Sequence, residues 1–197
     1  MKNKTIRLMI ALLLGLFASG AIAANGNVYG ALDIGQGTAK DACTGLPSSI
    51  SCTDTVAAYR VALGYQFNDN FSVEGSYSPE ATINASGTYL GTSISADESF
   101  SAFQFSVIGA YPVTGDFSLL GKVGMALIDA KATATGLTSV SYSNNNTNLA
   151  YGVGVKFAII KQLAIRVMYE DFGSVKTSNT SSGGNVTYLS AGLQFGF

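Results

Sequence analysis

The sequence has 197 residues, a length that suits one domain, with 11 Lys and Arg, 12 Asp and Glu, no His and 2 Cys. Hydrophobic residues make up 47% of the chain and charged residues 12%, which excludes disorder through a lack of apolar surface. A net charge of −1 gives no basic surface, so we expect no nucleic-acid partner. Without His, and with too few Cys for a Cys-rich site, we expect no metal and no cofactor.

Residues 1–23 have the three parts of a secretory signal peptide. The basic residues stand at the very start: Lys2, Lys4 and Arg7. An apolar run, Leu8–Phe17, follows, and Ala21–Ala23 provides a cleavage site with small residues. The run is too short for a transmembrane helix, which needs roughly 20 residues. We therefore expect an exported protein in which residues 24–197 form one domain.

The two cysteines, Cys43 and Cys52, lie close together in a polar stretch. In the oxidising compartment that an exported protein enters, we expect a disulfide that closes this small loop. A redox-catalytic pair is the alternative, but the spacing differs from the C-x-x-C of such sites. The expected role of the bond is therefore structural.

The rest of the chain alternates between apolar and polar residues and shows no convincing helical period. The expected strands are Val28–Gln36, Val56–Phe67, Phe71–Glu80, Phe100–Tyr111, Phe117–Ile128, Asn148–Phe157, Leu163–Glu170 and Val186–Phe197. Long polar connections are expected at 37–55, 81–99, 129–147 and 171–185, and short ones at 68–70, 112–116 and 158–162. Since long and short connections alternate, they gather on opposite rims. This predicts an eight-stranded antiparallel up-and-down transmembrane β-barrel, with short periplasmic turns and long extracellular loops.

The composition of the two strand faces favours a membrane barrel over a soluble one. The polar face consists mostly of Gly, Ala, Ser and Gln, whereas a surface in water should carry far more Lys and Glu. The apolar face places aromatic residues near the strand ends, as a girdle at the membrane interface requires. These residues are Tyr59, Tyr65, Phe67, Phe71, Phe117, Phe157, Phe195 and Phe197.

Seven charged residues fall in phase with the small polar residues, inside the expected barrel: Asp33, Arg60, Glu74, Lys122, Lys156, Arg166 and Glu170. On the lipid side, an Arg or Lys at mid-membrane would cost roughly 2–4 kcal/mol. Three acids face four bases in an interior only wide enough for side chains, so we expect an ion-pair network that plugs the lumen. The alternative is a gate whose partners exchange to open a thin water path, which would make the chain a narrow ion pore.

The sequence resembles the OmpA-like family of eight-stranded outer membrane β-barrels, which includes opacity-type proteins. The resemblance is carried by NVYGALDIGQG, YRVALGYQFNDNFSVEGSY, GAYPVTGDFSLLGKVGMAL, YGVGVKFAIIKQLAIRVMYEDFG and YLSAGLQFGF. It implies a location in the bacterial outer membrane and a lumen held by a network such as Arg60, Glu74, Lys122 and Arg166. It also implies insertion by the outer-membrane assembly machinery. That machinery would read a signal in the last strand, formed by Tyr188, Leu189, Ala191, Leu193, Phe195 and Phe197.

For function, we expect a structural barrel that displays its long connections at the cell surface. These connections, together with the adjoining Glu80, hold seven acids and three bases: Asp41, Asp54, Glu80, Asp97, Glu98, Asp129 and Asp171, with Lys40, Lys131 and Lys176. Their candidate partners are lipid, lipopolysaccharide and host surface molecules; the alternative is that they only keep the surface hydrated. We do not expect an enzyme, because barrel hydrolases of this kind resemble His-dependent catalysts and the chain has no His.

Overall fold

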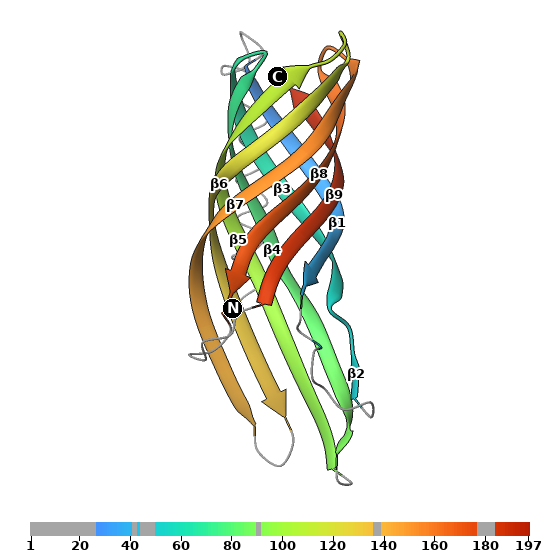
Figure 1. Cartoon of the computed structure of the whole chain (residues 1–197), viewed down its shortest axis with the longest axis vertical. Helices are drawn as coiled ribbons and strands as arrows, with labels where there is room; N and C mark the ends of the chain where they lie inside the picture. The colour runs from blue at the N-terminus through green and yellow to red at the C-terminus, as the bar shows by residue number, and fades with distance from the viewer. Residues whose placement is uncertain (1–26, 41–42, 44–49, 90–91, 136–138, 177–183) are drawn as a thin grey trace.

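In the computed structural model the chain forms a closed antiparallel barrel (Figure 1). The structure describes residues 27–40, 43, 50–89, 92–135, 139–176 and 184–197. The strands are β1 (Val28–Ala39), β2 (Ile50–Cys52), β3 (Thr55–Asn68), β4 (Phe71–Tyr89), β5 (Thr92–Pro112), β6 (Phe117–Thr135), β7 (Val140–Ile160), β8 (Leu163–Val175) and β9 (Gly184–Gly196). All except β2 pair in chain order, and β1 pairs with β9 to close the ring, which confirms the predicted eight-stranded barrel. The expected signal peptide lies outside the described residues.

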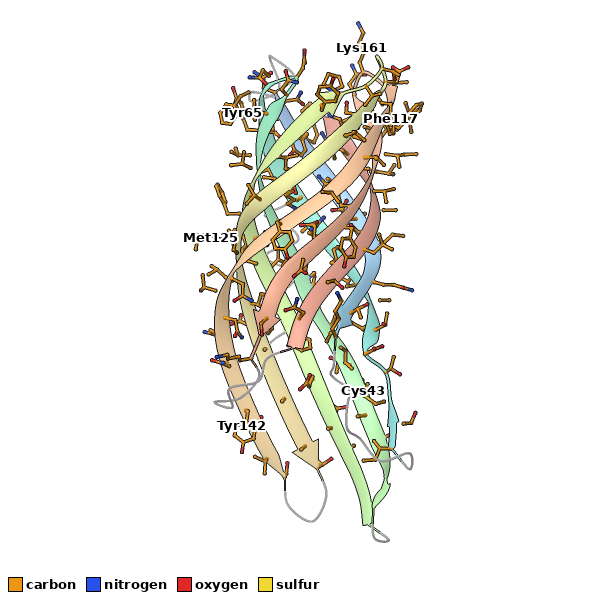
Figure 2. The ribbon with its side chains drawn as sticks, in the orientation of Figure 1. Cys43, Tyr65, Phe117, Met125, Tyr142 and Lys161 are labelled. Atoms are coloured by element: carbon orange, nitrogen blue, oxygen red, sulfur yellow. A yellow bond between two sulfur atoms is a disulfide. The ribbon has the colours of Figure 1, made fainter. Side chains whose placement is uncertain are left out.

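The alternation of each strand sends its large apolar side chains outward. Leu63, Val123 and Val167 are 51%, 51% and 39% exposed, whereas a barrel built for water would bury them. Met125 points away from the wall at mid-height, and Tyr65 and Phe117 stand near the rim with the short turns (Figure 2). The barrel therefore presents an apolar outer band with aromatic residues at its edge.

The height of this outer band fits a membrane. On β6 the outward apolar positions run from Phe117 to Leu127, and the next outward residue is Asp129. A transmembrane β-strand needs about 9–11 tilted residues, which matches this stretch. Among the described residues, no helix is long and apolar enough to cross a membrane.

Four strands continue past the outer band on one side of the barrel. β4 and β5 pair up to Tyr89 and Thr92, and β6 and β7 pair up to Ala134 and Val140. The prediction of loops at 81–99 and 129–147 is therefore wrong, because most of both segments is strand. We call the part formed by 81–89, 92–99, 129–135 and 140–147 the outer extension; it projects beyond the ends of β1, β8 and β9 (Figure 1).

Side-chain hydrogen bonds between neighbouring strands support the outer extension. The hydroxyls of Thr82 and Ser99 lie 2.9 Å apart, and those of Ser95 and Thr135 lie 2.5 Å apart. Ser and Thr read as loop residues in the sequence, yet opposite each other on paired strands they stabilise a sheet. This explains why the strands continue through segments that were expected to be loops.

The first long connection, expected as a loop over 37–55, contains the short strand β2. β2 pairs with β4 through Ser51 and Ser86, beside the edge that β3 leaves unpaired. Cys43 and Cys52 form the predicted disulfide, with their Cα atoms 5.8 Å apart. The bond ties the connection to β2, which covers an otherwise open strand edge.

Two β-bulges change which residues face the lumen. In β4 the two residues Pro79 and Glu80 stand opposite the single residue Ser101 of β5, and a bulge is a place where a sheet tolerates Pro, which has no N–H to donate. In β8 the bulge contains Gly173, whose φ of 70° suits Gly, and its N–H donates to Asp171 Oδ1 at 2.7 Å. Beyond these bulges the inward phase moves by one residue, so that Ile83 and Val175 are buried.

Candidate functional site

The side chains in the lumen form three layers along the barrel axis. The layer nearest the short turns is an apolar cluster of Ile108, Leu120 and Met168. The central layer is charged. The layer nearest the outer extension is apolar again and comprises Ala126, Ile128, Ala130, Ala150, Phe172, Val175 and Tyr188. The sequence placed charges and small residues in the lumen but did not predict this third layer.

The central layer contains six of the seven predicted lumen charges, each at most 4% exposed: Asp33, Arg60, Glu74, Lys122, Arg166 and Glu170. Arg166 donates two hydrogen bonds to the carboxylate of Asp33, from Nε to Oδ1 at 2.8 Å and from Nη2 to Oδ2 at 2.7 Å. Arg60 donates from Nε to the Oδ2 atom of Asp33 at 3.0 Å. Both guanidiniums thus meet on the carboxylate of Asp33.

The remaining contacts close these six side chains into a ring. Arg166 also pairs with Glu74, and Arg60 with Glu170. Lys122 Nζ lies 3.1 Å from Glu74 Oε1 and 3.1 Å from Glu170 Oε2. Every acid therefore contacts two bases and every base two acids, so that acids and bases alternate around a neutral circuit that we call the ion-pair ring.

Lys156, the seventh predicted lumen charge, lies apart from the ion-pair ring. Its side chain is partly buried in the lumen-facing phase of β7, toward the short turns. It lines a cavity of about 20 Å³ together with Tyr29 and Asp69. Within the described part of the chain Lys156 makes no ion pair, so the ring balances three acids with three bases, and not with four as the sequence indicated.

Neighbouring polar groups use further hydrogen-bonding capacity of the ring. Tyr29 donates its hydroxyl to Glu74 Oε2 at 3.2 Å, and Gln104 donates Nε2 to Glu170 Oε2 at 3.1 Å. The guanidinium of Arg60 lies 5.2 Å from the centre of the Tyr188 ring, within cation–π distance. Among the described side chains, Arg60 Nη2 and Ser190 Oγ are buried without a hydrogen-bond partner.

Glycines on adjacent strands make room for the ring. Gly192 of β9 stands beside both Asp33 on β1 and Arg166 on β8. A Cβ atom on Gly192 would lie 2.1 Å from Asp33 Oδ1, and one on Gly152 would lie 2.6 Å from the Cγ atom of Glu170. The large charged side chains of the ring therefore fit because the neighbouring positions on the adjacent strands are glycines. This match between charged residues and glycines can be seen only once the strand register is known.

The ring leaves little scope for metal binding. All three of its carboxylates are bound to cationic side chains. Within the described ranges, no group of three or more Cys, Asp or Glu side chains is arranged to hold a metal ion. The arrangement suits a neutral partition across the lumen.

The expected assembly residues occupy β9 and the residue after it. Leu189, Leu193 and Phe195 point outward and are about half exposed, as is expected for a lipid-facing strand. Ala191 shares this exposed phase, whereas Tyr188 is buried in the lumen. Phe197 donates its backbone N–H to Val28 at 2.9 Å and so ties the end of the chain to β1.

Comparison with solved structures shows the fold. Ail, the attachment invasion locus protein of Yersinia pestis, in complex with the heparin analogue sucrose octasulfate, is 18% identical, with a TM-score of 0.55 over 87% of this chain and 99% of that one. For Neisserial surface protein A the identity is 15% and the TM-score 0.54, over 86% and 97% of the two chains. For OprG from Pseudomonas aeruginosa they are 13% and 0.52, over 86% and 96%.

Comparison with sequences shows the family. No curated protein matches the chain. The model of the family described as "Outer membrane protein beta-barrel domain" matches residues 9–197, which is most of the chain. The apolar outer band, the closed eight-stranded ring and this match agree. The chain therefore belongs to the outer membrane protein β-barrel domain family, whose members lie in the bacterial outer membrane.

Proposed function

We propose that this chain is a closed barrel with a structural and surface-interaction role, which anchors the outer extension in the outer membrane and displays it outside the cell. The observation that carries this proposal is the ion-pair ring. A barrel whose lumen is closed by a neutral circuit of buried charges serves as an anchor and not as a channel.

The geometry of the ring favours a plug over a gate. Each charge has two partners, and the charges come from β1, β3, β4, β6 and β8, so that none of these five strands can move without breaking pairs. Breaking one buried pair leaves an uncompensated charge, which costs about 3–5 kcal/mol. A gate would have to meet this cost each time it opened.

The outer extension supports the display role. Its outward face is polar and carries Thr82, Asn84, Asp97, Ser99, Lys131, Thr133 and Ser141. The exposed pair of Lys131 and Glu80, at 3.2 Å, lies at its base. Such a face presents rows of hydroxyl, amide and charged groups to a polar partner and suits adhesion to a host surface molecule.

The charge of the displayed region indicates which partner it suits. Ail is described with a heparin analogue, which is a sulfated polyanion. In this chain the four long connections, together with the adjoining Glu80, carry seven acids and three bases, so that a polyanion would be repelled. We therefore propose a neutral or positively charged host surface molecule as the partner.

Other expectations remain part of this proposal. Residues 1–23 act as the signal peptide, β9 carries the signal for the outer-membrane assembly machinery, and lipid and lipopolysaccharide surround the barrel. We propose no catalytic activity, because the sequence has no His and the ring carboxylates are all paired.

Conductance in planar bilayers tests the plug. We expect the wild-type barrel to be silent and the Arg60→Ala variant to show small current steps, because that substitution removes a large side chain from the ring. Current steps from the wild-type protein would overturn the proposal that the ion-pair ring plugs the lumen and would favour a narrow ion pore.

Binding to host cells tests the display role. In the test variant, a two-residue turn replaces Lys131–Asn145 and shortens the β6–β7 hairpin while sparing the disulfide. Heat-modifiable gel migration checks that the barrel still folds. We expect bacteria with this variant to bind host cells severalfold less than the wild type. Equal binding by both strains would contradict a role of this hairpin in adhesion.

A further inference from the structure

A cavity of about 80 Å³ lies in the lumen between the ion-pair ring and the outer extension. Its lining comes from seven of the eight barrel strands and includes Ala39, Ala58, Ile83, Phe100, Ile128 and Phe172. The cavity belongs to the apolar third layer, which neither the plug nor the display role uses.

Most of the residues that line this cavity are apolar, and two of the hydroxyls in or beside its wall have hydrogen-bond partners. The hydroxyl of Tyr188 donates to the backbone oxygen of Ala58 at 3.2 Å. The hydroxyls of Thr38 and Thr55 lie 3.3 Å apart and bond to each other. An internal water needs two to four polar partners, and apolar cavities stay dry but bind apolar molecules. The cavity is therefore suited to hydrocarbon.

The floor of the cavity is closed toward the periplasm. Tyr188 lines the cavity, and the Arg60 guanidinium lies 5.2 Å from the centre of the Tyr188 ring. Below it the ion-pair ring fills the lumen. A ligand must therefore enter from the side of the outer extension and cannot pass through.

A strip of alanines leads from the outer extension to the cavity. One cross-strand row runs from Ala81 on β4 through Phe100 on β5 to Ala130 on β6. Another runs from Ala85 through Ala96 to Ala134 on the same three strands. Ala130 is fully buried, whereas Ala96 and Ala134 are exposed toward the outer end. The row between these two contains Ile83, Glu98 and Ala132, and Glu98 is the one charged side chain among the residues of the three rows on β4, β5 and β6. The strip is lined mainly by methyl groups and runs along successive cross-strand rows, so it suits an extended alkyl chain better than a compact ring.

We propose that the cavity and the alanine strip bind the alkyl chain of a single-chain amphiphile. The end of the alkyl chain lies against Tyr188, and the polar head remains at the outer extension in water. The binding is selective for an extended apolar chain, because the wall is mostly apolar and the alanines follow successive cross-strand rows. This site is independent of the surface-interaction role and of whatever partner the outward face binds.

Methyl NMR of the barrel in phospholipid nanodiscs tests this proposal. The probes are decanoate and decanol, which share an alkyl chain, and 1-adamantanol, which has a bulky apolar cage. We expect saturable shifts at Ile83, Ile128 and Ala130 with both decyl probes. Ala164, on the short-turn side of the ring, should stay unchanged. Shifts as large with 1-adamantanol, or none with either decyl probe, would overturn the proposal.

Filling the cavity provides the matched variants. Ala58→Leu places three additional carbons in the cavity, and we expect at least tenfold weaker binding of decanol. Ala57→Leu makes the same change on the outward face of β3 and should bind as the wild type does. If heat-modifiable gel migration shows that Ala58→Leu does not fold, Ala102→Val replaces it as a variant that fills less of the cavity. Unchanged binding by a folded filling variant would show that the chain binds elsewhere.

Discussion

Asp33 and Arg166 are joined by two hydrogen bonds of 2.8 and 2.7 Å, although 133 residues separate them along the chain. They lie on β1 and β8, and Gly192 of β9 stands between them. The pair therefore spans the strand that closes the barrel. Because both side chains are also held by other members of the ion-pair ring, the pair links the closing strand to the charged centre of the lumen.

Removal of Asp33 should destabilise the barrel strongly. In Asp33→Asn the ring keeps three bases but only two acids, and an uncompensated buried charge costs about 3–5 kcal/mol. Urea unfolding of the barrel refolded into lipid vesicles measures the loss. The exposed pair supplies the control: Lys131→Ala should change the free energy of unfolding by at most about 1 kcal/mol.

A double variant tests whether the loss comes from charge imbalance. Asp33→Asn with Arg166→Met leaves two acids and two bases, so it should lose less stability than the sum of the two single variants. Strictly additive losses would show that the two residues act separately and that the ring is not one electrostatic unit.

The space beside the ring gives a second prediction. A Cβ atom on Gly192 would lie 2.5 Å from the backbone oxygen of Leu32, so that Gly192→Ala should destabilise the barrel by about 1–3 kcal/mol. The matched control is Gly121→Ala on β6, where a Cβ would meet no atom of the described residues within 4 Å. That substitution should be neutral or slightly stabilising by the same urea measurement. Equal effects of the two would contradict the close packing.

The position of the membrane gives a third prediction. Val123 lies in the middle of the outer band, and Val123→Arg should cost about 2–4 kcal/mol in lipid vesicles. Thr133, on the same strand in the outer extension, should tolerate Thr133→Arg with almost no loss. If both variants lose similar stability, the proposed boundary of the membrane at Asp129 is wrong.

The unpartnered hydroxyl of Ser190 gives a fourth prediction. Its Oγ atom is buried and has no hydrogen-bond partner among the described residues, so Ser190→Ala removes an unsatisfied polar group and should be neutral or stabilising. Ser106 has a similar burial, but its hydroxyl donates to the backbone oxygen of Glu74 at 3.3 Å. Ser106→Ala should therefore lose about 0.5–1.5 kcal/mol in urea unfolding. A larger loss from Ser190→Ala would mean that its hydroxyl has a partner.

The sequence predicted the barrel because alternation in a membrane strand is set by lipid on one face and side chains on the other. It failed where polar residues continue a strand. Asn144 and Asn146 read as a loop, but their amides donate to the backbone oxygen of Lys176 at 3.1 and 2.9 Å. These side chains bind the end of β8 across the lumen side of β7, a contact that only the folded register brings about.

Phase alone also limited the prediction of the lumen. The alternation correctly predicted that Lys156 faces the lumen. Its height along the barrel axis, however, depends on the tilt and stagger of the strands, which place it nearer the short turns than the ion-pair ring. The apolar third layer was missed partly because bulges at Pro79 and Gly173 shift the phase of Ile83 and Val175. The alternation of apolar and polar residues shows which side chains face the lumen only as far as a bulge. Past the bulge the extra residue reverses the assignment, and the sequence does not show where the bulge lies.

The bridge from β8 to β1 over Gly192 has a kinetic consequence. Lateral opening at the seam between β1 and β9 would separate guanidinium from carboxylate inside a narrow space that offers no solvent to either ion. Such opening must break the Asp33–Arg166 pair together with Arg60–Glu170 and Glu74–Arg166, which also join β8 to strands on the far side of the seam. These ion pairs therefore oppose opening of the seam together, in addition to the backbone hydrogen bonds between β1 and β9.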